Sequence, residues 1–178
     1  MNLKSKIKLI LLQPLSFFIF VLHNFISKRR LKFKRKMLQM KYSIPNSVGF
    51  HLNTYIFGNG KIQLGENTYF GKNTFVVSNP AENQIVIGKN CRISHGCHIR
   101  TEDNDPSTLH LNKPIKLSND IIIGDNCWIG ANVFIRGGVK IGNNTTIGAN
   151  SVVTKSFPEN AIIAGVPARL IKIFDEPK

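Results

Sequence analysis

Aliphatic residues recur at every sixth position along most of the chain. Many of them are followed by glycine, as in Ile129-Gly130 and Ile147-Gly148. A period of six fits neither an α-helix, with 3.6 residues per turn, nor a long strand of alternating residues. It predicts short strands joined by corners, wound into coils that stack and bury the aliphatic residue of each repeat. The series is Leu64, Phe70 and Val76, then Ile87, Ile93 and Ile99, then Ile123, Ile129, Ile135, Ile141, Ile147 and Val153.

The corners between these strands contain residues that suit tight turns. Glycine adopts positive φ without a steric cost, and asparagine pairs such as Asn143-Asn144 favour the same turns. The repeat is interrupted between Val76 and Ile87, which are 11 residues apart, and again between Ile99 and Ile123, which are 24 residues apart, the length of four repeats. We therefore expect residues 102–118 to leave the coil as a loop without changing its register.

The C-terminal block IIIGDNCWIGANVFIRGGVKIGNNTTIGANSVVTKSFPENAIIAGVPARLIK, residues Ile121–Lys172, resembles the signature of the hexapeptide-repeat acyltransferases. The resemblance covers roughly residues 61–172 and is strongest to the sugar O-acetyltransferase branch, which includes maltose acetyltransferase-like and surface-polysaccharide enzymes. It implies an all-β fold, a left-handed parallel β-helix. We expect this domain over residues 43–172, with an N-terminal helical segment at 1–42, a short C-terminal helix and a tail at 173–178.

The first 42 residues are basic and apolar. They contain eleven Lys and Arg and no carboxylate, and the stretch LILLQPLSFFIFVLHNFI at 9–26 is mostly apolar. A basic cluster follows where a cleaved signal peptide has small residues, and polar residues such as Gln13 and Asn24 interrupt a membrane span. The pattern favours a helix on the inner-membrane surface, with its apolar side buried and its lysines on anionic head groups. Packing against a partner subunit and a true span are the alternatives.

The net charge of +14 comes mostly from this segment. The remainder is near neutral, so the charge indicates a local patch that meets an anionic surface, and no nucleic-acid partner. Cys91, Cys97 and Cys127 form no CxxC pair. We interpret them as small core residues in a reducing compartment. The protein is therefore predicted to be cytoplasmic and peripherally associated with the inner membrane.

The resemblance also implies a homotrimer that binds acetyl-CoA in the clefts between neighbouring subunits. Lys155 and Arg169 are the candidates for the CoA phosphates, because phosphate recognition uses charge-assisted hydrogen bonds; surface salt bridges are the alternative. Trp128, the single tryptophan, stands where sugar acetyltransferases have a tryptophan beside the acetyl donor, or it packs against a neighbouring subunit. The pantetheine arm is expected on backbone groups of Gly130, Ala131, Gly148 and Ala149, which otherwise serve only as turn formers.

A sugar hydroxyl is a poor nucleophile, so its acetylation calls for a base, and histidine has a suitable pKa. In the maltose-type enzymes the corresponding stretch resembles H-I-Y-T-x-x-H-P, and its last histidine is the base. Here the stretch is HIRTEDNDP, residues 98–106. His98, Ile99 and Thr101 match, but Asn104 and Asp105 stand where that histidine is expected. The role of base is therefore not assigned by resemblance.

Several explanations stay open. His110, further along the same loop, is the preferred base, and His98 is an alternative at a position that is ordinarily structural. Asp105 or Asp103 could take the proton if its pKa were raised, or could orient a histidine. The acceptor could instead be an amino sugar, whose amine needs little or no base, or catalysis could be lost.

A zinc site of the kind found in β-helical carbonic anhydrases, built from His95, His98 and His110, is disfavoured. Two histidines three apart on a coil do not define a common face. The sequence therefore predicts an acetyl-CoA-dependent O-acetyltransferase, without a metal, that acts on a sugar hydroxyl of a bacterial surface polysaccharide or its precursor. The alternatives are an amino-sugar N-acetyltransferase and an inactive hexapeptide-repeat scaffold.

Overall fold

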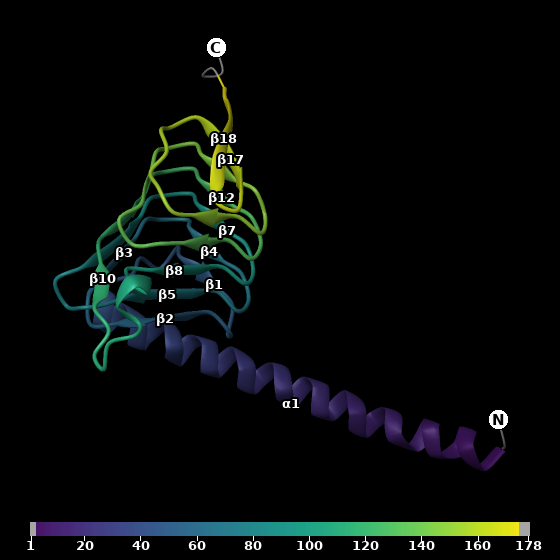
Figure 1. Ribbon diagram of the computed structural model, residues 1–178. Helices are drawn as coiled ribbons and strands as arrows, with labels where there is room; N and C mark the ends of the chain where they lie inside the picture. Colours follow the sequence, from purple (N-terminus) through teal and green to yellow (C-terminus); the bar gives the residue numbers. More distant parts are fainter. Residues whose placement is uncertain (1–2, 175–178) are drawn as a thin grey trace. The chain divides into compact units, whose positions relative to one another are not determined.

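The computed structural model describes residues 3–174, and their side chains from Phe18 onward. The chain divides into two compact units, residues 1–37 and 38–178, and each is described by itself. The first unit is the greater part of one long helix, α1 (Leu3–Tyr42), coloured purple in Figure 1. The end of α1 belongs to the second unit, where the Tyr42 hydroxyl donates a hydrogen bond to the Gly58 carbonyl (2.9 Å).

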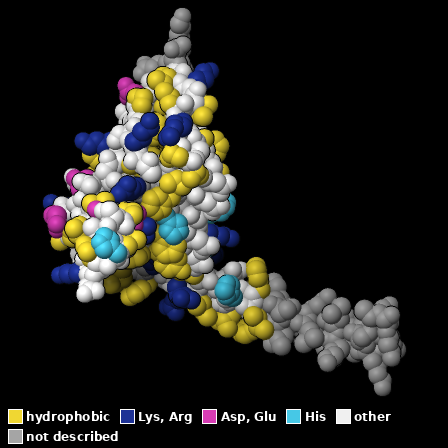
Figure 2. All heavy atoms as spheres, in the orientation of Figure 1, with side chains coloured by type: hydrophobic (Ala, Val, Ile, Leu, Met, Phe, Trp, Pro, Cys, Tyr) yellow, Lys and Arg dark blue, Asp and Glu magenta, His cyan; other side chains and the backbone are white. Residues whose placement is uncertain are grey.

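The apolar side chains of α1 are not confined to one side of the helix. Phe18, Ile19, Phe20, Val21 and Leu22 are consecutive and all exposed, and five residues make more than one turn of 3.6 residues. Figure 2 shows this hydrophobic surface next to the undescribed side chains. We expected α1 to be apolar on one side only. Instead, an apolar block is followed along the helix axis by a basic block. Within residues 3–174, no helix has the length and hydropathy that a membrane crossing needs.

The second unit is a parallel β-helix, in which three sheets surround one core (Figure 1). Each coil contributes one strand to each sheet, and every pairing within these sheets is parallel except the last pairing of sheet A, β17 with β18. Sheet A consists of β1 (Gly49–Phe50), β4 (Tyr69–Phe70), β7 (Arg92–Ile93), β12 (Trp128–Ile129), β15 (Thr146–Ile147), β17 (Ala161–Gly165) and β18 (Ala168–Ile173).

The other two sheets follow the same stacking order. Sheet B consists of β2 (Tyr55–Gly58), β5 (Phe75–Ser78), β8 (His98–Arg100), β13 (Phe134–Ile135) and β16 (Val152–Val153). Sheet C consists of β3 (Lys61–Leu64), β6 (Gln84–Ile87), β11 (Ile121–Ile123) and β14 (Lys140–Ile141).

The six-residue series forms the core, which confirms the predicted register. All twelve positions from Leu64 to Val153 are buried, and Phe70, Val76 and Ile99 are fully so. The β-helix also begins one coil closer to the N-terminus than the sequence pattern indicated. Phe50 and Ile56 are buried in the same core as the twelve predicted positions. The three cysteines are free and buried; Cys91 and Cys127 donate to the carbonyls of Gly124 and Gly142 in the next coil.

The corner between sheets C and A is built from a ladder of asparagines. Asn126 has φ +57°, a left-handed conformation that asparagine tolerates better than other residues with a side chain. Its Nδ2 donates to Oδ1 of Asn144 (3.1 Å), and its Oδ1 accepts from Nδ2 of Asn90 (3.2 Å). The same conformation and the same type of bond recur at Asn67, Asn90, Asn144 and Asn160.

The expected short C-terminal helix is not found among the described residues. β18 runs as a strand to Ile173 and pairs antiparallel with β17. Gly165, at φ +106°, makes the tight turn between the two strands, and the β-branched Ile171 and Ile173 favour the extended conformation. Residues 175–178 of the expected tail lie outside the described residues.

An excursion leaves the β-helix between sheets B and C. It contains β9 (Glu102–Asn104), the short 3₁₀ helix η1 (Pro106–Thr108) and β10 (Lys116–Ser118), and β9 pairs antiparallel with β10. Its base is closed where the Asn119 amide donates to the Thr101 carbonyl (3.0 Å). The excursion is therefore an ordered hairpin, and it returns the chain to the core at Ile121.

Candidate active site

A column of aromatic rings lies on the outer face of sheet B. Tyr55, Phe75, His98 and Phe134 are paired in register on neighbouring strands. The rings of Tyr55 and Phe75 stack with centroids 4.7 Å apart, and those of Phe75 and His98 with centroids 4.8 Å apart. These distances equal the spacing between strands. The imidazole of His98 is thus stacked on Phe75 and exposed on the outer face of the sheet.

The position of this column follows from the repeat. The residue before each buried aliphatic residue of sheet B points outward, as Phe75 does before Val76 and His98 before Ile99. The residue after it points outward as well, which places Arg100 beside Arg136 of the next coil. When the repeats are written in register, two columns of outward-pointing side chains on sheet B become apparent. Of these residues, our sequence analysis had singled out only His98.

A hollow of about 300 Å³ opens beside the column, where the excursion leaves the sheet. This volume is at the lower end of the range for small-molecule sites. Aromatic and aliphatic side chains form one part of its wall, and polar groups form the other. Those used below are Phe57, Phe75, His98, Asn79, Arg100 and Glu102.

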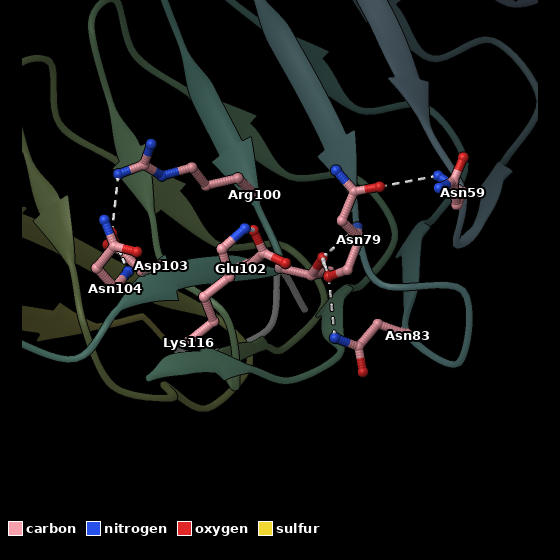
Figure 3. Close-up of polar contacts among 9 residues, drawn as sticks. Asn59, Asn79, Asn83, Arg100, Glu102, Asp103, Asn104 and Lys116 are labelled. Carbon is pink, nitrogen blue, oxygen red and sulfur yellow. Dashed lines mark hydrogen bonds and ion pairs between the residues drawn. The ribbon is translucent and has the colours of Figure 1, made fainter. Parts of the chain in front are cut away.

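The polar groups of this hollow are held by the base of the excursion (Figure 3). Arg100 forms an ion pair with Asp103 (3.2 Å), and its guanidinium lies over the ring of Phe134, 5.0 Å from the centroid. Glu102 accepts from Lys116 across the hairpin (2.6 Å). Asn79 accepts through Oδ1 from the amide of Asn59 (2.9 Å).

Asn104 and Asp105 occupy the positions at which the family histidine was expected. Asn104 is exposed on β9, and its amide donates to Asp103 (3.0 Å). Asp105 caps η1 and accepts from both the hydroxyl (2.7 Å) and the amide (2.9 Å) of Ser107. These hydrogen bonds lower the pKa of the Asp105 carboxyl. A carboxylate base requires the opposite shift, so the lowered pKa does not support Asp105 as the base.

His110 lies beyond η1 and is exposed. Among the described residues it has no hydrogen-bond partner, and the leucines on either side of it, Leu109 and Leu111, are exposed too. The structure therefore distinguishes the two candidate histidines: His98 is positioned beside a hollow, and His110 stands on the surface of the hairpin.

The residues predicted to bind the donor lie on sheet A and on the corner between sheets A and B. Trp128 is 60% exposed on β12, between Arg92 and Thr146 of the neighbouring coils. Ala131 and Ala149 leave the corner open, whereas Gly130 is buried. A Cβ at Gly130 would lie 2.6 Å from the amide nitrogen of Ala149, so the stacking of coils already requires a glycine there.

The remaining donor candidates are small or basic residues near the last coils. A Cβ at Gly148 would meet the Cβ of Ala164 at 2.9 Å. Lys155 is exposed and lies 5.6 Å from the ring centroid of Phe157. Arg169 is exposed on β18 and donates to the carbonyl of Ala168 (3.3 Å). Neither cation has a carboxylate partner in the part of the chain that the structure describes.

The candidate groups thus occupy two faces of the β-helix: His98 is on sheet B and Trp128 on sheet A. The small side chains at the corner between these sheets leave room for an extended ligand such as acetyl-CoA. Within one copy, no group of three or more potential metal ligands lies together among residues 3–174.

Stacked six-residue repeats around three parallel sheets, with an ordered hairpin beside a hollow, define the class of β-helical hexapeptide-repeat proteins. The family model described as bacterial transferase hexapeptide (six repeats) matches residues 120–155. The WbbJ protein of Escherichia coli (strain K12), whose name refers to lipopolysaccharide biosynthesis O-acetyl transfer, is 34% identical over 143 residues, 75% of this chain and 70% of that protein. The chain belongs to the hexapeptide-repeat transferase family.

Two further comparisons name enzymes with sugar acceptors. The polysialic acid O-acetyltransferase of Escherichia coli O1:K1 / APEC is 38% identical over 132 residues, 70% of this chain and 42% of that protein. The structure of a galactoside acetyltransferase in complex with coenzyme A matches with a TM-score of 0.65 and 30% identity, over 82% of this chain and 72% of that one. The chain spans less than two thirds of the length of the polysialic acid enzyme.

Proposed function

We propose that the protein is an acetyl-CoA-dependent O-acetyltransferase that acts on a sugar hydroxyl of a bacterial surface polysaccharide or its precursor. The observation that carries the proposal is the likeness, over most of the chain, to the galactoside acetyltransferase with bound coenzyme A. The polysialic acid enzyme and the WbbJ protein support a sugar acceptor. An amino-sugar acceptor is the second candidate, favoured by the absence of a histidine at Asn104 and Asp105.

We assign the role of base to His98. Its ring stacks on Phe75 and it lines the hollow, as a base that must meet a substrate proton requires. The imidazole takes the proton of the acceptor hydroxyl while the hydroxyl oxygen attacks the thioester carbonyl. The carbon–sulfur bond then breaks, and the proton passes to the leaving thiolate, which gives the acetyl ester and free CoA. His110 is the alternative base, and it would need a neighbouring copy to reach a cleft.

The donor-binding proposal keeps Trp128 for the acetyl end and the corner at Ala131 and Ala149 for the pantetheine arm. Gly130 and Gly148 contribute by letting the coils stack closely. Lys155 and Arg169 are proposed for the phosphates because both are exposed cations without a carboxylate partner among the described residues.

Because His98 and Trp128 lie on different sheets, we propose that one active site combines sheet B of one copy with sheet A of another. A homotrimer of left-handed β-helices, as the family resemblance implies, provides three such clefts. The test is sedimentation analysis of the full chain: a trimer is expected, and an active monomer would contradict the shared cleft.

We further propose that residues 1–42 attach the protein to the cytoplasmic surface of the inner membrane, and that residues 43–172 perform catalysis. An apolar block followed by basic residues suits insertion of the block below the head groups, with Lys and Arg on anionic lipid. Sedimentation with phosphatidylglycerol vesicles tests this. Phe18→Ser/Phe20→Ser/Phe25→Ser should reduce binding, whereas Phe57→Ser, an exposed phenylalanine of the β-helix, should not.

The activity is tested by incubating the full chain with acetyl-CoA and sugar acceptors, and by detecting both CoA release and the acetylated product by mass spectrometry. His98→Ala should lower kcat by about 10²- to 10⁴-fold, the usual contribution of a general base, while His110→Ala should leave it unchanged. Equal rates for both variants and the parent would remove His98 from the mechanism. Product formed only from amino sugars would favour N-acetylation.

A further inference from the structure

The hollow beside His98 has a balanced set of charges. Arg100 and Glu102 line it, and each has an opposite charge on the excursion: Asp103 for Arg100 and Lys116 for Glu102. The next cation, Arg136, lines a separate hollow of about 140 Å³ that also contains Asp103. It is close enough to Asp105 to lower the pKa of that carboxyl, although less than Ser107 does.

The two charged groups that line the hollow, Arg100 and Glu102, are thus each in an ion pair, whereas Arg136 forms no ion pair among the described residues. Figure 2 shows Asp and Glu side chains among Lys and Arg on the side where β10 runs in Figure 1. The balance is local, because the chain as a whole has a net charge of +14. A carboxylate-bearing ligand entering the hollow would meet no uncompensated cation.

The same groups retain hydrogen-bonding capacity for a neutral ligand. A guanidinium has five N–H donors and a carboxylate accepts at two oxygens, whereas the ion pairs with Asp103 and Lys116 use only part of this capacity. The Nδ2 group of Asn79 makes no hydrogen bond within the described residues, since its Oδ1 makes the bond to Asn59. The lining thus combines these donors and acceptors with the aromatic side chains of Phe57 and Phe75.

We propose that this hollow is the acceptor subsite and that it selects a neutral sugar over one that bears a carboxylate. The proposal rests on the proposed acetyltransferase function. Hydroxyls of a neutral ring satisfy Asn79, Arg100 and Glu102 without disturbing either ion pair. A hexuronate would bring a second carboxylate into a hollow that already contains Glu102 and whose cation, Arg100, is paired with Asp103, so the repulsion would discriminate against it. The substrate class therefore differs from that named for the polysialic acid enzyme.

The test uses acceptor pairs that differ only at the sixth carbon: methyl galactoside against methyl galacturonoside, and methyl glucoside against methyl glucuronoside. The measured quantity is the ratio of kcat/KM for the neutral sugar to kcat/KM for the acidic sugar of a pair. The full chain should prefer the neutral member in each pair that it accepts. A preference for the acidic members would overturn the proposal.

Two charge variants should shift this ratio in opposite directions. Glu102→Gln leaves Lys116 uncompensated and should move the ratio toward the acidic sugar by about two- to fivefold, the size of one partly exposed charge interaction. Lys116→Gln leaves Glu102 uncompensated and should move it toward the neutral sugar by a similar factor. The matched control is Glu66→Gln, which makes the same charge change at an exposed corner away from the hollow, and it should leave the ratio unchanged.

Direct binding separates this proposal from the proposed function. Saturation-transfer NMR of the full chain with methyl galactoside and methyl glucoside, without acetyl-CoA, should detect binding that Arg100→Ala weakens. Neutral-sugar binding without any acetyl transfer would contradict the activity but retain the subsite. Transfer with an unchanged ratio in Glu102→Gln and Lys116→Gln would retain the activity and overturn the subsite. Failure to bind either neutral sugar and to transfer to any probe would overturn both.

Discussion

Replacing Asn126 by alanine and by glycine separates the two reasons for an asparagine at this corner. Its backbone has φ +57°, and its side chain bonds to Asn90 and Asn144 in the adjacent coils. Alanine removes both bonds and, unlike asparagine, has no polar side chain that eases the left-handed conformation. Glycine removes the bonds but accepts the backbone conformation.

The magnitudes follow from the structure. The side chain is exposed, so each lost hydrogen bond is taken at the low end of the usual range, about 0.5 kcal/mol. The left-handed conformation adds about 1 kcal/mol for alanine. We therefore expect Asn126→Ala to lower the free energy of unfolding by about 2 kcal/mol and Asn126→Gly by about 1 kcal/mol. At roughly 2–4 °C per kcal/mol, the melting temperature should fall by about 4–8 °C for alanine and about half as much for glycine.

The assay is thermal unfolding followed by circular dichroism, at one protein concentration because association shifts the apparent stability. Asn112→Ala is the control: this residue is exposed on the excursion and does not have positive φ, so its effect should stay within about 0.5 kcal/mol. Equal losses for alanine and glycine would refute the conformational part of the reasoning. No loss for either would refute the ladder as a source of stability.

Three further outcomes follow from the structure. Gly130→Ala should lower the free energy of unfolding, measured in urea, by about 1–3 kcal/mol, because the added Cβ would press on the Ala149 backbone. Unchanged stability would mean that this glycine is needed only for ligand binding. Burial raises the pKa of the Cys97 thiol, and the hydrogen bond with Cys91, together with burial, raises that of Cys127. Both should therefore resist iodoacetamide at pH 8 in the folded protein and react in urea, as mass spectrometry would show. In NMR titration the Asp105 carboxyl should titrate below its ordinary range, and Ser107→Ala should raise its pKa. Since the folded-state pKa is lowered, the stabilising contribution of Asp105 is present at neutral pH and is lost as pH falls through that pKa; an unshifted titration in Ser107→Ala would contradict the capping role.

The core was predictable because the hexapeptide rule constrains every inward position. Ile129 and Ile147 are 18 residues apart, one regular coil, and the rule is unbroken there. The first coil was missed for the same reason in reverse. Phe50, Ile56 and Ile62 keep the six-residue spacing and are buried, but eight residues separate Ile56 from Leu64, whose partner in the next coil is Ile87. Counting back in sixes from Leu64 therefore misses the first coil.

The C-terminal strand shows a different limit of pattern reading. After Ile163 the buried series ends, and all of Arg169–Ile173 is exposed. An exposed segment has no periodic pattern of buried residues. The sequence pattern therefore does not distinguish a helix from a strand there. The antiparallel pairing of β18 with β17 decides the conformation, and pairing is a property of the fold rather than of the local sequence.

The candidate site was harder to predict because the repeat says nothing about outward side chains. Resemblance led to the excursion, where the expected histidine is absent, and the preferred substitute, His110, is exposed on that hairpin. His98 was kept only as an alternative, because its position is ordinarily structural in the enzymes that the sequence resembles. Yet a side chain on a strand is held by its neighbours on both coils, whereas one on a loop surface is not, and precise chemistry is better supported by the former. The stacking of Phe75 on His98 supplies that support. In a β-helix of this kind, the outward columns of the regular sheets should therefore be read for chemistry before the loops are.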